Sequence, residues 1–173
     1  MSEIIITDLS EHPEYFEPVM EIFFESSTKK EFASVEERVR FLVKYLGVYV
    51  QSYPELVLVA VKDDKILGYC CGMPHTPPEL YELLPHLEVF EDTYETYPAH
   101  LHINCHADAR GMGIGTKLMA EFEDTMQSQG VTGLHVITSP EAKNVHFYEK
   151  LHYDFQLERN FQGSRLLLLG KTL

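Results

Sequence analysis

A glycine-rich turn is the part of the sequence whose residue types and spacing are best suited to binding a ligand. Its members are Arg110, Gly111, Met112, Gly113, Ile114, Gly115 and Thr116. Glycines allow positive φ and let the backbone approach a ligand closely. The turn precedes a helical pattern, and the free N–H groups at a helix start, with the helix dipole behind them, favour an anion. Because Arg110 adds a positive charge, the turn predicts a pyrophosphate site.

Two common nucleotide motifs do not fit this turn. Counted from Gly111, the second glycine of a P-loop would be residue 116, which is Thr, and Lys117 is followed by Leu118. A dinucleotide fingerprint accepts Gly111 and Gly113 but also requires glycine in place of Thr116. A tight connection between a strand and a helix, without any ligand, is the alternative interpretation.

Two histidines form a second group with chemical potential. His100 and His102 lie two residues apart in a β-like run, so they share one face of the expected strand. Imidazole titrates near neutral pH and suits proton transfer, although each histidine can equally be a half-buried, hydrogen-bonded residue. No convincing third ligand accompanies the pair, so no metal is expected. Glu95 is another candidate base, and Cys105 is expected to be a small buried strand residue rather than a nucleophile.

Strands and helices must position these residues, and the hydrophobic pattern predicts a mixed α/β chain. Strands are expected at residues 4–6, 56–61, 66–72, 100–105, 134–138, 155–159 and 166–169. Helices are expected at residues 13–24, at 34–53, from the glycine turn to Gly130, and at 139–152. The proline-rich stretch 74–98 is expected to be a surface excursion with one short helix near residues 79–84.

Local signals fix the ends of two of these helices. Ser34 and Glu37 have the spacing of a capping box, and Ser139-Pro140-Glu141 combines a cap, a first-turn proline and an acid. After the first of these starts, apolar residues recur at helical spacing: Val39, Leu42, Val43, Leu46 and Val50.

Length and composition limit the kinds of protein that this chain can be. Its 173 residues suit one domain, 1–173. A net charge of -13 argues against nucleic acid or anionic membrane partners and favours a cationic substrate. No apolar stretch approaches the roughly 20 residues that cross a bilayer. Three cysteines, two of them adjacent, and an amino-terminus unlike a signal peptide predict a cytoplasmic protein.

Two motifs taken together resemble those of the GNAT superfamily of N-acetyltransferases. The superfamily binds the CoA pyrophosphate with a Q/R-x-x-G-x-G/A motif, and Arg110, Gly113 and Gly115 match it in register. An aromatic helix of the type F-Y-x-x-x-G-F is matched by residues 147–153, FYEKLHY. The likeness covers most of the chain and is most convincing over residues 56–155.

The resemblance implies a mixed α/β GNAT fold. Its central sheet would have six to seven mostly antiparallel strands, splayed between the fourth and fifth, with about four flanking helices. It also implies an enzyme that uses acetyl-CoA as co-substrate and moves the acetyl group directly to a primary amine. The acceptor would be a small-molecule amine or a protein amino group, and the protein a monomer or a homodimer.

The resemblance also assigns roles to individual positions. Tyr148 would be the general acid that protonates the departing thiolate, although its ring can equally pack in the core. For the base, the residues themselves offer His102 and His100, acting directly or through a water. Backbone N–H groups of the fourth strand would polarise the thioester carbonyl and pair with the pantetheine arm. Beside the glycine turn, the expected CoA contacts are Ile103, Asn104, Cys105, Asn144 and Phe147.

Some positions depart from the superfamily pattern or suggest narrower relatives. His152 stands where glycine is usual, and Glu141 where asparagine is frequent. Residues 97–104 resemble a strand in the acetyltransferase-like domain of O-GlcNAc hydrolases, and the two histidines are similar to those of arylalkylamine N-acetyltransferases. The acidic and aromatic loop 88–98 either receives a cationic amine or is a solvated charged loop.

Two other functions fit the same residues. The chain is alternatively an acetyltransferase-like module that binds acyl-CoA without turnover, which tight donor binding with no thiol release would indicate. It is otherwise a structural or interaction protein whose glycine turn only connects two elements, which a folded chain without CoA affinity would indicate.

Overall fold

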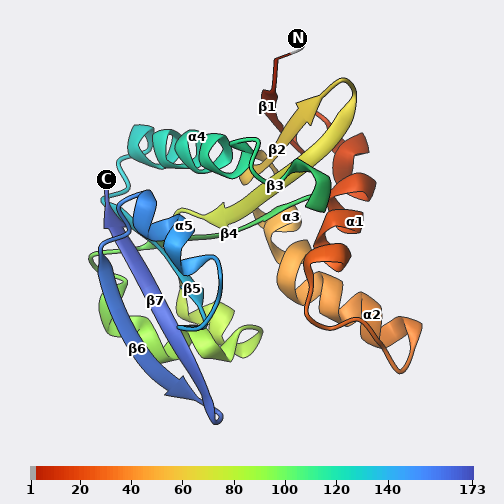
Figure 1. Ribbon diagram of the computed structural model, residues 1–173. Helices are drawn as coiled ribbons and strands as arrows, with labels where there is room; N and C mark the ends of the chain where they lie inside the picture. The colour runs from red at the N-terminus through yellow and green to blue at the C-terminus, as the bar shows by residue number, and fades with distance from the viewer. Residues whose placement is uncertain (1–2) are drawn as a thin grey trace. The chain divides into compact units, whose positions relative to one another are not determined.

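The fold is known from a computed structural model that describes residues 3–173, and it contains one mixed sheet (Figure 1). The seven strands are β1 (Ile5–Asp8), β2 (Val57–Lys62), β3 (Lys65–Met73), β4 (Ala99–Cys105), β5 (Gly133–Thr138), β6 (Phe155–Phe161) and β7 (Ser164–Thr172). Their order in the sheet is β1-β2-β3-β4-β5-β7-β6. Strands β4 and β5 pair in parallel through two residue pairs, whereas β1–β2, β2–β3, β5–β7 and β6–β7 pair antiparallel. The predicted sheet is therefore confirmed.

Five α-helices accompany the sheet within the described residues. They are α1 (Phe16–Ser26), α2 (Val35–Leu42), α3 (Val48–Ser52), α4 (Ile114–Ser128) and α5 (Val145–Lys150). The number exceeds the predicted four because the segment predicted as one helix at 34–53 contains two.

Contacts group the chain into two compact units. The first comprises Met1–Gly72 with His102–Asp124, and the second comprises Met73–Leu101 with Thr125–Leu173. The sequence boundaries between them fall inside β3, inside β4 and inside α4. That residues 1–173 form a single domain stays a prediction.

Strand β2 supplies the centre of the first unit's core. Its residues Val57, Val59 and Ala60 are fully buried, as expected for a continuous β-branched and aliphatic run between two neighbouring strands. The hairpin to β3 closes through Asp63 and Asp64, both at positive φ, which matches the right-handed twist of paired strands.

A π-helical turn interrupts the predicted helix 34–53. Ser34 caps α2 by accepting from the N–H of Glu37 (3.2 Å), so the predicted helix start is confirmed. A π-helical turn, η2 (Val43–Gly47), then separates α2 from α3. Of the apolar residues that recur at helical spacing, Leu46 is buried, whereas Val39 and Val43 are 49% and 41% exposed.

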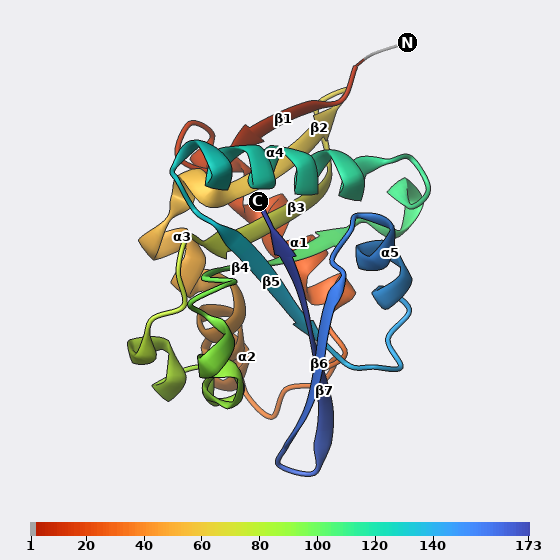
Figure 2. The same cartoon turned by 90° about the vertical axis from the view of Figure 1, so that its left-hand side faces the viewer.

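The proline-rich stretch of the second unit is packed rather than merely a surface excursion. It forms two 3-10 helices, η4 (Pro78–Glu82) and η5 (Pro85–Thr93). Four apolar side chains in or between these helices are buried: Leu80, Leu84, Leu87 and Phe90. Figure 2 shows the same unit's β6–β7 hairpin as two long strands joined by a tight turn.

The predicted helix start at Ser139 is wrong. Ser139 accepts from the N–H of Glu141 (3.3 Å) but closes only a single turn, and α5 begins at Val145. Side chains on both sides of Ser139 are engaged in other contacts. Glu141 pairs with Arg165, and Thr138 donates to the side chain of Asn144. These side-chain contacts hold residues 139–144 as turns.

The end of α5 holds a histidine in a conformation that favours glycine. His152 has a φ of 65°, its N–H donates to the Glu149 carbonyl (3.0 Å), and the Tyr153 N–H donates to the Tyr148 carbonyl (3.2 Å). The helix therefore ends as it would with glycine, but the left-handed conformation costs a non-glycine residue about 1 kcal/mol or more.

Replacing His152 with Gly should therefore raise the free energy of unfolding by about 1 kcal/mol and the Tm by about 2–4 °C. His152 is exposed, so little packing is lost. Thermal unfolding followed by circular dichroism measures the effect, and an unchanged or lower Tm would contradict it.

Candidate functional site

The glycine turn of the first unit opens α4 and leaves its backbone donors accessible. Gly111 and Gly113 have φ of 79° and 75°, which explains why glycine stands at both positions. The carbonyl of Gly113 accepts the N–H of Lys117 (3.1 Å), so Gly113 is the residue from which the helix begins. The N–H groups that follow it have no intrahelical partner in an α-helix.

The space beside this turn can accommodate a ligand. A Cβ added at Gly111 or Gly113 would meet no atom within 4 Å. Arg110, Met112 and Thr116 are exposed, whereas the side chain of Ile114 is buried and anchors the helix. Open space, accessible N–H groups and an exposed guanidinium fit the pyrophosphate of CoA, with Ile114 able to contribute only its backbone.

The carboxyl-terminal half of β4 leads into this turn within the same unit. Ile103, Asn104 and Cys105 are partly buried. The side-chain amide of Asn104 donates to the Tyr69 hydroxyl (2.9 Å), so the side chain is used inside the fold. Burial raises the pKa of the Cys105 thiol, against a smaller lowering by Arg110. This shift is consistent with a strand residue rather than a nucleophile.

His102 is held by the π-helical turn. Its Nε2 lies 2.9 Å from the Tyr45 carbonyl oxygen and 2.8 Å from the Cys71 Sγ. Because a carbonyl only accepts, Nε2 carries the proton and Nδ1 has the free lone pair. Burial lowers the pKa of His102 to about 4, so the ring is neutral at pH 7. The rings of Tyr49 and Tyr69 contact it edge-on.

The sulfur beside His102 is not an activated thiolate. Cys71 is fully buried, and burial raises its pKa well above the ordinary value. A protonated, inaccessible thiol does not act as a nucleophile. Cys71 therefore packs against His102 and helps to orient its ring.

His100 belongs to the second unit and is more deeply buried, with 5% of its surface exposed. The Thr76 hydroxyl donates to the Pro98 carbonyl (2.9 Å), so the Nδ1–H of His100 donates to Thr76 Oγ1 (2.7 Å). Its register partner in β5 is His135, with the ring centroids 5.8 Å apart. The arrangement favours a structural role for His100 over that of a base.

His135 is a buried histidine that the sequence reasoning did not single out. Its Nδ1 donates to the Tyr97 carbonyl (2.7 Å) and its ring stacks on Tyr94. Within residues 3–173 its buried Nε2 finds no hydrogen-bond partner. A second proton there would have no acceptor, and burial accordingly lowers the pKa of His135 to about 4. No local sequence signal marks it, because its pairing with His100 is set by the sheet.

His102 and His135 should make the folded protein less stable in acid. Between pH 6.5 and 4 the unfolded chain protonates His102 and His135 while the folded chain does not, because both folded pKa values are depressed to about 4. The unfolded state binds more protons, so stability falls as pH falls, by roughly 1.4 kcal/mol per pH unit and histidine. Replacing His135 with Asn, which keeps a donor for Tyr97, should make urea-unfolding stability fall less steeply from pH 6.5 to 5. An identical slope in both proteins would contradict this account.

Tyr148, Phe147 and Asn144 lie together at α5 in the second unit. Tyr148 is 4% exposed, and its ring packs against Phe147 and Tyr153, with centroids 5.2 and 5.7 Å away. Asn144 is exposed, but its Oδ1 accepts from the Thr138 hydroxyl (3.0 Å). Its side chain is therefore already engaged, which weakens its case as a CoA contact.

The rings of the acidic and aromatic loop 88–98 are engaged inside the protein, and the Arg159 guanidinium carbon lies 5.6 Å from the centroid of the Phe90 ring. The Tyr94 ring lies on His135 and its hydroxyl donates to the Leu87 carbonyl (2.6 Å), while Tyr97 stacks on Phe155. Asp92 forms a two-pronged ion pair with Arg159, which lowers the pKa of Asp92. The loop's aromatic rings serve internal packing instead.

Two features are absent from the described part of the chain. No helix within residues 3–173 is long and apolar enough to span a membrane. Over the same residues, no three side chains of His, Cys, Asp or Glu gather as metal ligands would.

Solved structures of known proteins share this fold. SsHAT is 21% identical, with 98% of each chain covered and a TM-score of 0.75. A ribosomal-protein-alanine N-acetyltransferase from Brucella melitensis is 20% identical over 98% of this chain and 99% of that one (TM-score 0.62). The yncA protein from Salmonella typhimurium, solved with its cofactor acetyl-CoA, is 13% identical over 98% and 94% (TM-score 0.61).

A comparison of the sequence with protein families identifies the family of this chain. The profile of the Acetyltransferase (GNAT) family matches residues 16–153, which include both the glycine turn and the aromatic helix. The narrower likeness to the domain of O-GlcNAc hydrolases is not supported by these comparisons and stays a prediction. Since the matched residues make up well over half of the chain, the protein belongs to the Acetyltransferase (GNAT) family.

Proposed function

We propose that this protein is an acetyl-CoA-dependent N-acetyltransferase that acts on a primary amine. The accessible glycine turn carries the proposal, since its positive-φ glycines, open space and helix N–H groups fit a pyrophosphate. Acyl transfer is the chemistry of the family, and the yncA structure contains acetyl-CoA. When bound, acetyl-CoA supplies an acetyl group activated as a thioester.

The chain's own residues would divide the remaining tasks. Arg110 and the N–H groups after Gly113 would hold the pyrophosphate, and the backbone of Ile103–Cys105 would orient the acyl arm. Tyr148 would donate its phenolic proton to the departing sulfur.

His102 is the better candidate of the two histidines for the base. Its Nε2–H is fixed by the Tyr45 carbonyl, so Nδ1 is the atom that can accept a proton from the amine or from a water. A pKa of about 4 keeps the ring neutral and ready to accept, but it holds the proton weakly. We therefore propose that His102 passes the proton on to solvent rather than storing it.

The same low pKa supports the alternative of an acyl-CoA-binding module without catalysis. An efficient general base has a pKa near the working pH, and both histidines predicted as bases are engaged in hydrogen bonds inside the fold. The alternative predicts donor binding without turnover.

Thiol release from acetyl-CoA in the presence of amines distinguishes the two proposals. The amines tested should include arylalkylamines, polyamines and peptides with free amino-termini. The peptides are included because one structural neighbour is named for acetylating a ribosomal protein. Release that depends on one class of amine supports the enzyme. Tight donor binding with no release in any reaction would instead support the binding module.

We further propose that the protein is cytoplasmic and that it is a monomer or a homodimer.

A further inference from the structure

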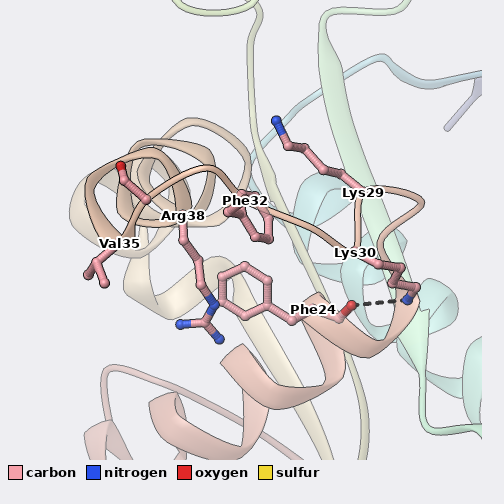
Figure 3. Close-up of a pocket in the computed structure, with 7 residues that line it drawn as sticks. Phe24, Lys29, Lys30, Phe32, Val35 and Arg38 are labelled. Carbon is pink, nitrogen blue, oxygen red and sulfur yellow. Dashed lines mark hydrogen bonds between the residues drawn. The ribbon is translucent and has the colours of Figure 1, made fainter.

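A pocket of about 550 Å³ lies in the first unit, where α1 ends and α2 begins (Figure 3). The segment 27–34 connects the two helices and forms one side of it. The volume is within the range of pockets that bind small molecules. No residue of the glycine turn or of β4 lines it, so it is separate from the proposed acetyl-CoA site.

The walls of the pocket are apolar and aromatic. Phe24 and Phe32 line it, with their rings 5.9 Å apart and nearly perpendicular. Val35 adds an aliphatic side chain that is 74% exposed. These walls suit a ligand with an apolar body, because they offer surface that is otherwise in water.

Three cations line the same pocket, and one of them is neutralised by a carboxylate. Lys29 Nζ lies 2.5 Å from Glu37, which forms an ion pair. Lys30 Nζ donates to the carbonyls of Phe24 (3.3 Å) and Glu25 (2.6 Å), so it caps the end of α1 without losing its net charge. In Figure 3 its dashed bond to Phe24 is visible.

Arg38 is the cation best placed to recognise a ligand. Its guanidinium carbon lies 3.7 Å from the centroid of the Phe24 ring, and Figure 3 shows the group beside that ring. In the part of the chain that the structure describes, no carboxylate lies within ion-pair distance of it. A planar guanidinium held on an aromatic ring keeps its N–H fork available for a bidentate acceptor.

The charge of the residues that line the pocket is opposite to that of the whole chain. Lys30 and Arg38 carry two positive charges that no carboxylate of the lining offsets, whereas the first turn of α2 combines the positive end of its helix dipole with the acids Glu36 and Glu37. The chain as a whole carries a charge of -13.

We propose that this pocket binds a small organic anion in which a carboxylate is attached to an aryl body. The carboxylate pairs with Arg38 and receives a further hydrogen bond from Lys30. The aryl group lies against Phe24, Phe32 and Val35. Binding requires neither acetyl-CoA nor turnover, so the proposal stands or falls independently of the proposed function.

Titration of the ¹⁵N-labelled protein with phenylacetate tests the proposal, followed through the backbone amide signals. Saturable shifts centred on residues 24–38 are expected. The neutral analogue phenylacetamide and inorganic phosphate each lack one half of the proposed recognition, so both should bind at least several-fold more weakly. Phosphate binding as tightly as phenylacetate would overturn the role of the aryl group, and equal binding of phenylacetamide would overturn that of the anion.

Variants at Arg38 separate recognition from general charge. Arg38→Gln should weaken phenylacetate binding about tenfold or more, since a charged hydrogen-bonded partner is lost, and Arg38→Lys should recover only part of it. Arg40→Gln is the matched control, because it removes the same charge from α2 outside the pocket. The spectra without ligand report whether each variant is folded. Absence of saturable shifts in the wild type, or equal weakening by Arg38→Gln and Arg40→Gln, would overturn the proposal.

Discussion

Replacing Tyr148 with Phe is expected to lower kcat by about a hundred- to ten-thousandfold, the usual contribution of a positioned general acid. The affinity for acetyl-CoA should hardly change. Tyr148 is buried against Phe147 and Tyr153, and phenylalanine keeps that ring packing while removing only the hydroxyl. The measurement is steady-state thiol release with the best of the amines tested, together with acetyl-CoA binding by calorimetry.

Tyr153→Phe is the matched control for this substitution. Tyr153 is also fully buried, and its ring is the neighbour of Tyr148, so removing its hydroxyl tests whether any buried phenol in this cluster matters. Turnover by Tyr153→Phe should stay within a few-fold of the wild type. Full turnover by Tyr148→Phe would remove Tyr148 from the mechanism and leave the thiolate to be protonated by another group.

Replacing Gly113 with Ala is expected to weaken acetyl-CoA binding about tenfold to a hundredfold. Gly113 has a φ of 75° at the start of α4. A Cβ there meets no protein atom, so the effect cannot come from overpacking. The loss of affinity has two causes: the backbone leaves the left-handed region, and a methyl group enters the space of the ligand. Together they should remove one or two charged hydrogen bonds to the pyrophosphate.

Gly163→Ala separates the loss of binding from the loss of stability. Gly163 has a φ of 81° in the β6–β7 turn, and a Cβ there is equally unobstructed. Both variants should lose about 1 kcal/mol of stability, but only Gly113→Ala should lose affinity for acetyl-CoA. Equal affinity in the two variants would show that the glycine turn does not bind the donor.

The strands and the glycine turn were predictable because their signals are local. The β2–β3 hairpin follows from two short aliphatic runs around Asp63-Asp64, and the start of α2 follows from Ser34 and Glu37. Positive φ at Gly111 and Gly113 follows from the residue type and the position before a helix. In each case the neighbouring residues alone determine the conformation.

Features that depend on distant residues were not predictable in the same way. The π-helical turn at Val43–Gly47 has no sequence signal, yet it gives His102 its carbonyl partner, Tyr45. The late start of α5 accompanies an ion pair between Glu141 and Arg165, which are 24 residues apart. The environment of His135 depends on sheet pairing. Tertiary contacts override local propensity at all of these positions.

The roles of individual site residues were predictable only in part. The sequence identified His100 and His102 as a pair on one strand, but only the structure distinguishes them. Thr76 holds His100 in a buried position, whereas the Tyr45 carbonyl fixes His102 with Nδ1 as its acceptor atom. The loop 88–98 shows the opposite outcome, because the rings that suggested a cation site are stacked on His135 and Phe155.

Thermal unfolding with and without acetyl-CoA tests the central claim most directly, since it asks only whether the chain binds the donor. Acetyl-CoA at a hundred times its Kd should add about 2.7 kcal/mol to the free energy of unfolding, which corresponds to a rise in Tm of about 5–10 °C for a domain of this size. NADH and ATP at the same concentration should produce no comparable rise. No shift with millimolar acetyl-CoA would contradict the account and would leave the glycine turn as a connection between β4 and α4.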